Sequence, residues 1–214
     1  MSFIAGQSIK ERAVEFFIRE SVLKFGDFTL KSGKKSPYFF NTGSLCTGHQ
    51  LTVLGELYAE KLRSIEAFHE ATVIFGSAYK GIPIAVASAI AMARVGHSDI
   101  RSVSDRKEAK THGDTSAFLG VINSGDKVVI VDDVVTTGGT KIEALEKLRE
   151  IGAVPLGFIV AFDRMEKAEN SDQTAIEHLA ETTGLPVFAL ATAQDIAKLK
   201  PEFASVLEAH LAAA

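Results

Sequence analysis

The chain has 214 residues, of which 46% are hydrophobic and 23% are charged, and its formal net charge is −4. These values are typical of a soluble globular protein long enough for one α/β domain, and they give no general reason to expect nucleic acid or a membrane surface as a partner. Any binding site for an anion must therefore be local. Cys46 has no second cysteine for an internal disulfide, no signal-peptide pattern opens the chain, and the uncharged run 81–93 is too short to span a bilayer. We therefore expect a single cytoplasmic domain over residues 1–214.

The first predicted element is an amphipathic helix over residues 8–24, because apolar residues recur there on one helical face. Ser8 suits the N-cap position, and Glu11, three residues later, completes a capping box. Gly26 is the expected stop of this helix, since glycine adopts the left-handed conformation that ends many helices.

A hairpin is expected next. Residues 28–30 and 38–41 have the composition of two short strands, and a basic turn that contains glycine separates them. Lysines at such a turn are usually solvated. The residues by themselves therefore indicate a hairpin tip with aromatic side chains directed into the core.

Strand–loop–helix units follow the hairpin. Residues 51–65 form a second amphipathic helical pattern, in which Gly55 indicates close packing, and residues 71–75 are predicted to be a buried strand. The loop 76–81 and an apolar helix over residues 82–93 come after this strand. Repeated units of this kind predict a parallel sheet.

The segment 105–114 is polar and shows no apolar period. It is predicted to be a loop or a frayed helix, and its charges by composition alone indicate a solvated face.

The stretch 128–141 carries the clearest functional signal. Four β-branched residues, from Val128 to Val131, predict a strand buried on both faces, and Asp132 and Asp133 stand at its carboxyl end. In an open α/β sheet, ligands bind outside the carboxyl ends of the strands, and a Gly/Thr loop that leads into a helix offers N–H groups to an anion. The two carboxylates would repel a phosphate but suit the vicinal hydroxyls of a sugar, so the residues indicate a ribose phosphate. The same stretch would also fit an ordinary strand-to-helix turn that begins with aspartate.

A strand is predicted over residues 155–162, with Asp163 and Arg164 at its carboxyl end. These two side chains could form a simple surface ion pair. The remaining predicted elements are a helix over 171–183, a strand over 187–190 and a short last helix over 193–199.

The run from Val128 to Thr140, with its two acids, two aliphatic residues and Thr-Thr-Gly-Gly-Thr, resembles the signature of the type I phosphoribosyltransferases. These enzymes bind 5-phosphoribosyl-1-diphosphate (PRPP), and no Walker-type or dinucleotide glycine motif is present as a rival phosphate loop. Within this group, Lys31-Ser32-Gly33 and the residues from Ser36 to Asn41 resemble the N-terminal segment of the orotate phosphoribosyltransferases. The resemblance extends over nearly the whole chain. It implies the type I α/β fold: a central, mostly parallel sheet flanked by helices, with a small N-terminal hood mainly from residues 1–45.

The resemblance also implies roles for individual residues. The catalytic residues would be Lys110, Asp132 and Asp133. The PRPP-binding residues would be Lys31, Tyr79, Lys80, Arg106, Lys107, Lys110, His112, Asp132, Asp133, Val134, Val135, Thr136, Thr137, Gly138, Gly139 and Thr140. The orotate-binding residues would be Phe39, Phe40, Thr136 and Arg164. The planar guanidinium of Arg164 suits a carboxylate. The resemblance also implies a cis peptide bond between Ala78 and Tyr79.

The implied reaction transfers the 5-phosphoribosyl group from PRPP to orotate and gives orotidine 5′-monophosphate and diphosphate, a step of pyrimidine (UMP) biosynthesis. Mg²⁺ is expected with PRPP, held mainly by diphosphate, sugar hydroxyls and water, so no protein metal ligand is named. The resemblance further implies a homodimer in which the 105–115 loop reaches the partner's site. Neither nucleic acid nor a membrane is expected as a partner.

Two alternatives stay open at this point. A phosphoribosyltransferase for a purine or for uracil would share the PRPP site but not the base site, and the hood segment and Arg164 argue against it. A non-catalytic PRPP-sensing regulator would be expected to bring a DNA-binding segment and to lose the loop lysines. This chain has no such basic extension and keeps Lys107 and Lys110.

Overall fold

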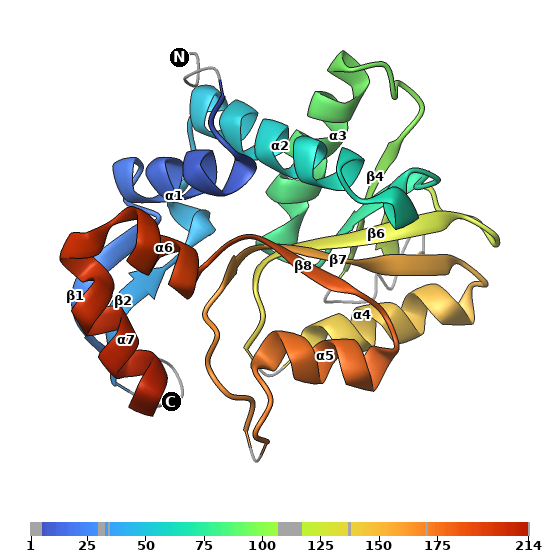
Figure 1. The fold of residues 1–214 in the computed structure, drawn as a ribbon. Helices are drawn as coiled ribbons and strands as arrows, with labels where there is room; N and C mark the ends of the chain where they lie inside the picture. Colours follow the sequence, from blue (N-terminus) through green and yellow to red (C-terminus); the bar gives the residue numbers. More distant parts are fainter. Residues whose placement is uncertain are drawn as a thin grey trace.

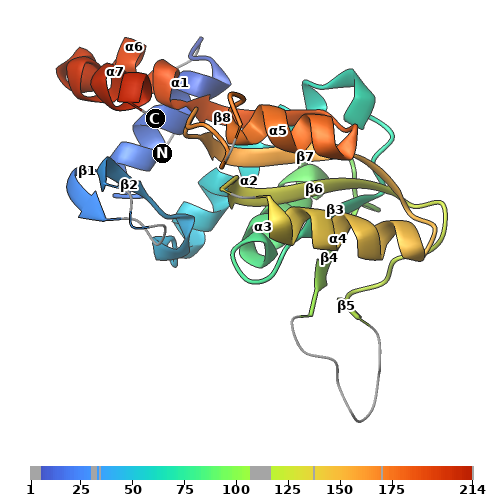
Figure 2. The same ribbon diagram turned by 90° about the horizontal axis from the view of Figure 1, so that it is seen from below.

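A six-stranded sheet with the order β5-β4-β3-β6-β7-β8 forms the centre of the molecule in the computed structural model (Figure 1). Its strands are β3 (Val73–Gly76), β4 (Arg101–Asp105), β5 (Phe118–Leu119), β6 (Lys127–Val134), β7 (Val154–Asp163) and β8 (Val187–Thr192). Neighbouring strands are parallel except β4 and β5, which pair antiparallel at the edge (Figure 2). The structure describes residues 6–29, 33, 35–106, 117–136, 138–169 and 171–213.

Helices cover both faces of the sheet (Figures 1 and 2). The helices of the described residues are α1 (Ile9–Arg19), α2 (Gly48–Arg63), α3 (Gly81–Arg94), α4 (Gly139–Glu150), α5 (Ala175–Thr183), α6 (Ala193–Leu199) and α7 (Ala204–Ala213), with short 3-10 turns at Thr42–Ser44, Glu66–Phe68 and Pro201–Phe203. No helix among the described residues is long and apolar enough to cross a membrane.

The alternation of side chains along β6 explains why this strand needs apolar residues at every position. Val129 and Val131 pack into the apolar cluster formed with α2 and α3, whereas Val128 and Ile130 pack into the cluster formed with α4 and α5. Successive side chains of a strand point to opposite faces, so a strand covered on both faces has no polar side. The predicted doubly covered strand and the predicted mostly parallel sheet are confirmed.

Strands are added to the sheet on one side of β3 and then on the other, so the strand order reverses between β3 and β6. The connection through α3 places β4 on one side of β3, and the connections through α4 and α5 place β7 and β8 on the far side of β6. The carboxyl ends of β3 and β6 therefore flank the topological switch point, where ligands bind in folds of this type.

The N-terminal helix begins where the sequence predicts. The Ser8 side chain accepts a hydrogen bond from the Glu11 N–H, and the Glu11 carboxylate accepts one from the Ser8 N–H, so the capping box is confirmed. The predicted end of this helix is wrong: α1 ends at Arg19, and Gly26 lies inside β1 (Leu23–Thr29) at an irregularity of the ladder. Pairing with β2 (Lys35–Phe40) overrides the helical pattern after Arg19.

The hairpin of β1 and β2 does not stand alone. The C-terminal helices α6 and α7 lie beside it in Figure 1, and the rings of Phe25 and Phe203 stack with centroids 3.5 Å apart. The prediction that the helix over residues 193–199 is the last one is wrong, because α7 follows it. The hood over the sheet is therefore built from both ends of the chain.

Candidate active site

Two lysines hold the two carboxylates at the carboxyl end of β6. The Nζ of Lys80, from the loop after β3, lies 2.5 Å from Oδ2 of Asp133, and the Nζ of Lys141, in the first turn of α4, lies 2.6 Å from Oδ2 of Asp132. The Lys80 side chain is 45% exposed, whereas that of Lys141 is 5% exposed. One pair is thus open to a ligand, and the other is part of the interior.

Burial sets the electrostatics of this pair of acids. The removal of Asp133 from water raises its pKa, and the negative charge of Asp132 raises it further; the hydrogen bonds from Lys80 and from the Val134 N–H act in the opposite direction. The Tyr58 hydroxyl in α2 donates to the carbonyl oxygen of Asp132 at 2.7 Å, and its own pKa is raised by burial. Two adjacent acids in a poorly hydrated site form a strong local field for cationic and hydroxyl groups.

The loop between β3 and α3 is fixed tightly against the sheet. An ideal Cβ on Gly76 would lie 2.0 Å from the carbonyl oxygen of Gly81, and one on Gly81 would lie 2.9 Å from the carbonyl oxygen of Val131. The Ala78 N–H donates to Oδ1 of Asp105 at 2.7 Å, and the predicted cis peptide bond between Ala78 and Tyr79 is confirmed.

The loop between β3 and α3 carries both an exposed and a buried side chain. Tyr79 is 66% exposed. The hydroxyl of Ser77 is buried and finds no hydrogen-bond partner among the described residues.

The loop after β6 presents small residues and main-chain groups. Gly138 has φ 76° and leads into α4, which receives no side-chain cap from the described residues. Val135 is buried, whereas Thr136, Gly139 and Thr140 are exposed. Since the first N–H groups of a helix have no partner within it, the start of α4 can offer main-chain donors to an anion.

The two aromatic residues predicted to border the base differ in the structure. The ring of Phe39 is 40% exposed and lies near Phe28, whereas the ring of Phe40 is buried and stacks on Phe162 at 4.9 Å. Contact of Phe40 with a ligand would therefore have to be made by its backbone.

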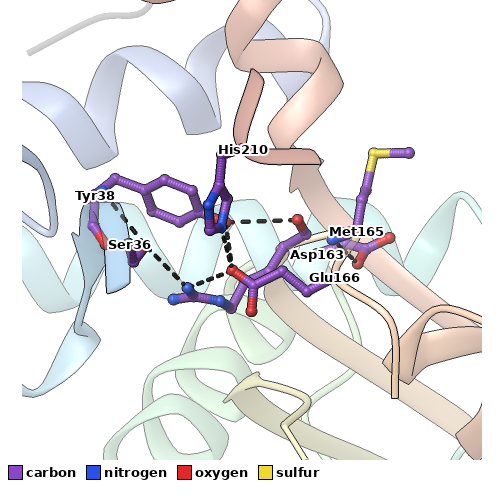
Figure 3. Close-up of polar contacts among 7 residues, drawn as sticks. Ser36, Tyr38, Asp163, Met165, Glu166 and His210 are labelled. Atoms are coloured by element: carbon purple, nitrogen blue, oxygen red, sulfur yellow. Dashed lines mark hydrogen bonds and ion pairs between the residues drawn. The ribbon is translucent and has the colours of Figure 1, made fainter. Parts of the chain in front are cut away.

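Arg164 lies in a network of contacts with Ser36, Tyr38 and Glu166. Figure 3 shows these three neighbours together with His210. The Nη2 of Arg164 donates to Oε1 of Glu166 at 2.5 Å and to the hydroxyl of Ser36 at 3.3 Å, and its guanidinium carbon lies 4.7 Å from the centre of the Tyr38 ring. Asp163 is not its partner: Oδ1 of Asp163 accepts the Met165 N–H at 2.8 Å. The interpretation of these two residues as a simple surface pair is wrong, because Arg164 is 9% exposed.

The partners of Glu166, the acid beside Arg164, favour its ionised form. Burial opposes ionisation of Glu166, but hydrogen bonds from Arg164 and from His210 outweigh it and lower the pKa of this carboxyl. Nε2 of His210, on α7, lies 2.9 Å from the same oxygen of Glu166 that Arg164 contacts. Arg164 is therefore linked through Glu166 to the C-terminal helix.

Arg106 forms hydrogen bonds between the two ends of the segment predicted to be a polar loop. Its N–H donates to the carbonyl of Ala117 at 2.9 Å, and its Nε donates to the carbonyl of Phe118 at 3.2 Å. Several predicted ligands lie outside the described residues, namely Lys31, Lys107, Lys110, His112 and Thr137.

Some residues of the site were not predicted from the sequence. They are Tyr58, Asp105, Lys141 and Glu166, each of which contacts a predicted site residue or its loop, and His210, which contacts Glu166. The position of Lys141 directly after the Thr-Gly-Gly-Thr loop is a usable signal, because the first turn of a helix normally favours acidic residues. His210 lies far from the motifs in sequence, and no local pattern marks it.

The acids at the end of β6 do not form a metal cage. The part of the chain that the structure describes contains no group of three or more His, Cys, Asp or Glu side chains that could hold a metal ion, and Asp132 and Asp133 each pair with a lysine. This arrangement fits a divalent cation that binds mainly through substrate oxygens and water.

A family model described as the phosphoribosyl transferase domain matches residues 48–193, which contain both βα loops described above. The chain therefore belongs to the phosphoribosyl transferase family.

Relatives that match over most of their length narrow this class. The orotate phosphoribosyltransferase of Bifidobacterium adolescentis is 42% identical over 195 residues, which cover 88% of this chain and 84% of that protein. That of Methylococcus capsulatus is 45% identical over 184 residues, which cover 86% of this chain and 84% of that protein. The crystal structure of the orotate phosphoribosyltransferase of Francisella tularensis matches with a TM-score of 0.80 and 35% identity, over 92% of this chain and 96% of that one. These relatives place the chain among the orotate phosphoribosyltransferases, pentosyltransferases of pyrimidine biosynthesis.

Proposed function

We propose that this orotate phosphoribosyltransferase carries out its reaction at the switch point between β3 and β6, with PRPP over Asp132 and Asp133. The contact between Lys80 and Asp133 across that point is the observation that supports this placement most strongly. A half-exposed cation beside a buried acid can turn to the diphosphate of the substrate while the acid accepts hydrogen bonds from the ribose hydroxyls. The 5′-phosphate would lie in the turn from Val134 to Thr140, against the start of α4.

The chemistry follows from the charges that develop during the transfer. A ring nitrogen of orotate attacks the anomeric carbon while diphosphate leaves from the opposite face, so positive charge builds on the sugar and negative charge on the leaving group. Asp132 and Asp133 favour the cationic sugar, and Lys80 and the lysines of the 105–115 segment favour the departing diphosphate. Groups that meet these charges more strongly in the transition state than in the ground state raise the rate.

Recognition of orotate falls to the hood side of the site. Arg164 would bind the orotate carboxylate, and Phe39, the backbone of Phe40 and Thr136 would border the ring. Arg164 is held over Tyr38 in a buried position, where a charge-assisted hydrogen bond is stronger than in water.

Mg²⁺ is proposed to bind together with PRPP, where it would neutralise part of the diphosphate charge. The acids of β6 are engaged by lysines, so the substrate and water would supply most of its ligands. The single-domain organisation over residues 1–214 and the cytoplasmic location also stay predictions.

A panel of bases tests the base assignment. Purified enzyme with PRPP and Mg²⁺ should release diphosphate with orotate and not with uracil, hypoxanthine or adenine. Arg164→Ala should raise the KM for orotate while the KM for PRPP changes little. An unchanged orotate KM in this variant would remove Arg164 from the site.

The proposed homodimer, in which the 105–115 loop serves the partner's site, can be tested by mixing two inactive variants. In a heterodimer of Lys110→Ala and Asp133→Asn, a loop that acts on the partner's site leaves one site with both wild-type residues. Random re-association should then restore about a quarter of the wild-type activity, because half of the dimers are mixed and each has one intact site. If each loop serves its own subunit, mixing restores none.

A further inference from the structure

Three side chains from distant parts of the sequence meet at one oxygen of Glu166. Arg164 Nη2 lies 2.5 Å from this Oε1, His210 Nε2 lies 2.9 Å from it, and the Tyr38 hydroxyl lies 3.4 Å from it. They come from the position directly after β7, from α7 and from β2, and Figure 3 shows Tyr38 and His210 beside Glu166. The side chains of Arg164, Glu166 and His210 are 10%, 18% and 15% exposed.

An acid in this position has two opposite effects on Arg164. It orients the guanidinium, but it also competes with a substrate carboxylate for the same charge. A second donor on the same acid weakens this competition, because it shares the negative charge and fixes the carboxylate on one side of the arginine. His210 is placed to be that donor.

The remaining donors of Arg164 support this interpretation. Its hydrogen bonds to described residues all pass through Nη2, to Glu166 and Ser36, while Nε and Nη1 make none within the described part of the chain. The Tyr38 ring lies under the guanidinium, and the His210 ring meets Tyr38 edge-on at 5.7 Å. The guanidinium is thus held from one side and keeps donors for a ligand on the other.

We infer that His210, on the C-terminal helix, is a positioning residue for orotate binding: it holds Glu166 and, through it, the guanidinium of Arg164. The inference rests on the proposed role of Arg164. It makes the end of the chain part of the base site, although His210 itself does not touch the substrate. A purely structural role for His210 would instead anchor α7 to the hood and leave the relative affinity for the two substrates unchanged.

Steady-state kinetics of the full-length enzyme separate these roles. In His210→Ala, the KM for orotate should rise by about three- to tenfold, while kcat and the KM for PRPP change less than about twofold. His210→Gln should restore most of the orotate affinity, since its side-chain amide can donate to Glu166. Glu208→Ala, which removes an exposed side chain from the same helix, should behave as wild type.

Each other outcome decides the matter. Equal changes in both KM values, no change in either, or failure of His210→Gln to restore orotate affinity would overturn the inference. If His210→Ala does not fold, His210→Phe keeps a ring against Tyr38 without the donor and is judged by the same criterion. Arg164→Lys separates this inference from the proposed function: if it leaves the orotate KM unchanged, the base assignment fails, and if it raises that KM while His210→Ala does not, only the role of His210 fails.

Discussion

The buried ion pair between Lys141 and Asp132 gives the sharpest test of how the acids of β6 are held. Lys141→Met keeps the approximate length of the side chain and removes its charge. Asp132 would then stand 11% exposed and unpaired beside Asp133, with Lys80 as the one cation paired to this couple among the described residues. Removal of one partner of a buried pair costs about 3–5 kcal/mol.

The size of this cost can be measured by unfolding. For a domain of this length, each kcal/mol corresponds to roughly 2–4 °C in Tm, so Lys141→Met should lower Tm by roughly 6–20 °C. The double variant Lys141→Met/Asp132→Asn leaves no uncompensated charge and should recover most of that loss, because replacement of both partners is often nearly neutral.

Denaturant unfolding of the wild type, both single variants and the double variant forms a complete double-mutant cycle. A coupling energy of about 2 kcal/mol or more is expected between the two side chains. The reasoning fails if Lys141→Met costs less than about 1 kcal/mol, or if the double variant is as unstable as Lys141→Met alone.

Three further substitutions test other contacts of the site. Burial and the neighbouring acid raise the pKa of Asp133 above 3.8, so the contribution of this carboxyl to the stability of the fold is lost as the pH rises through the raised pKa. Asp133→Asn should therefore raise Tm at pH 7, while kcat falls about 100-fold or more. A lower Tm of this variant across pH 5–8 would contradict this expectation. Gly76→Ala would place a Cβ 2.0 Å from the Gly81 carbonyl oxygen. We expect the free energy of unfolding to fall by about 1–3 kcal/mol and calorimetry to show weaker PRPP binding. An affinity equal to that of the wild type would show that the loop tolerates the shift. Tyr58→Phe removes the 2.7 Å hydrogen bond to the Asp132 carbonyl. Urea unfolding should show a loss of about 1–2 kcal/mol in the free energy of unfolding, with only a small change in kcat. A loss of kcat as large as that of Asp133→Asn would give the hydroxyl a larger role.

Local signals in the sequence were enough to predict much of the fold. The β-branched run from Val128 to Val131 requires burial on both faces, and the structure provides it. The Ser8 capping box is a contact between residues three apart, so the sequence contains all of it. Gly55 was predicted to mark close packing, and an ideal Cβ there would lie 2.3 Å from the carbonyl oxygen of Ala87.

Contacts between distant segments were the ones missed. The helical pattern beyond Arg19 gives way to β1 because this segment pairs with β2, a partner that the local pattern does not contain. A distant partner also explains why the surroundings of Arg164 were missed. The pairing of Glu166 with His210 joins positions 44 residues apart and depends on where α7 packs. A pattern of neighbouring residues contains no information about such a contact.

A crystal structure with PRPP and Mg²⁺ would show whether a ribose phosphate binds at the carboxyl end of β6. We expect the 5′-phosphate in the turn from Val134 to Thr140, the ribose hydroxyls within hydrogen-bond distance of Asp132 or Asp133, and the diphosphate near Lys80. PRPP bound elsewhere, with these two acids still closed by their lysines and out of its reach, would contradict it.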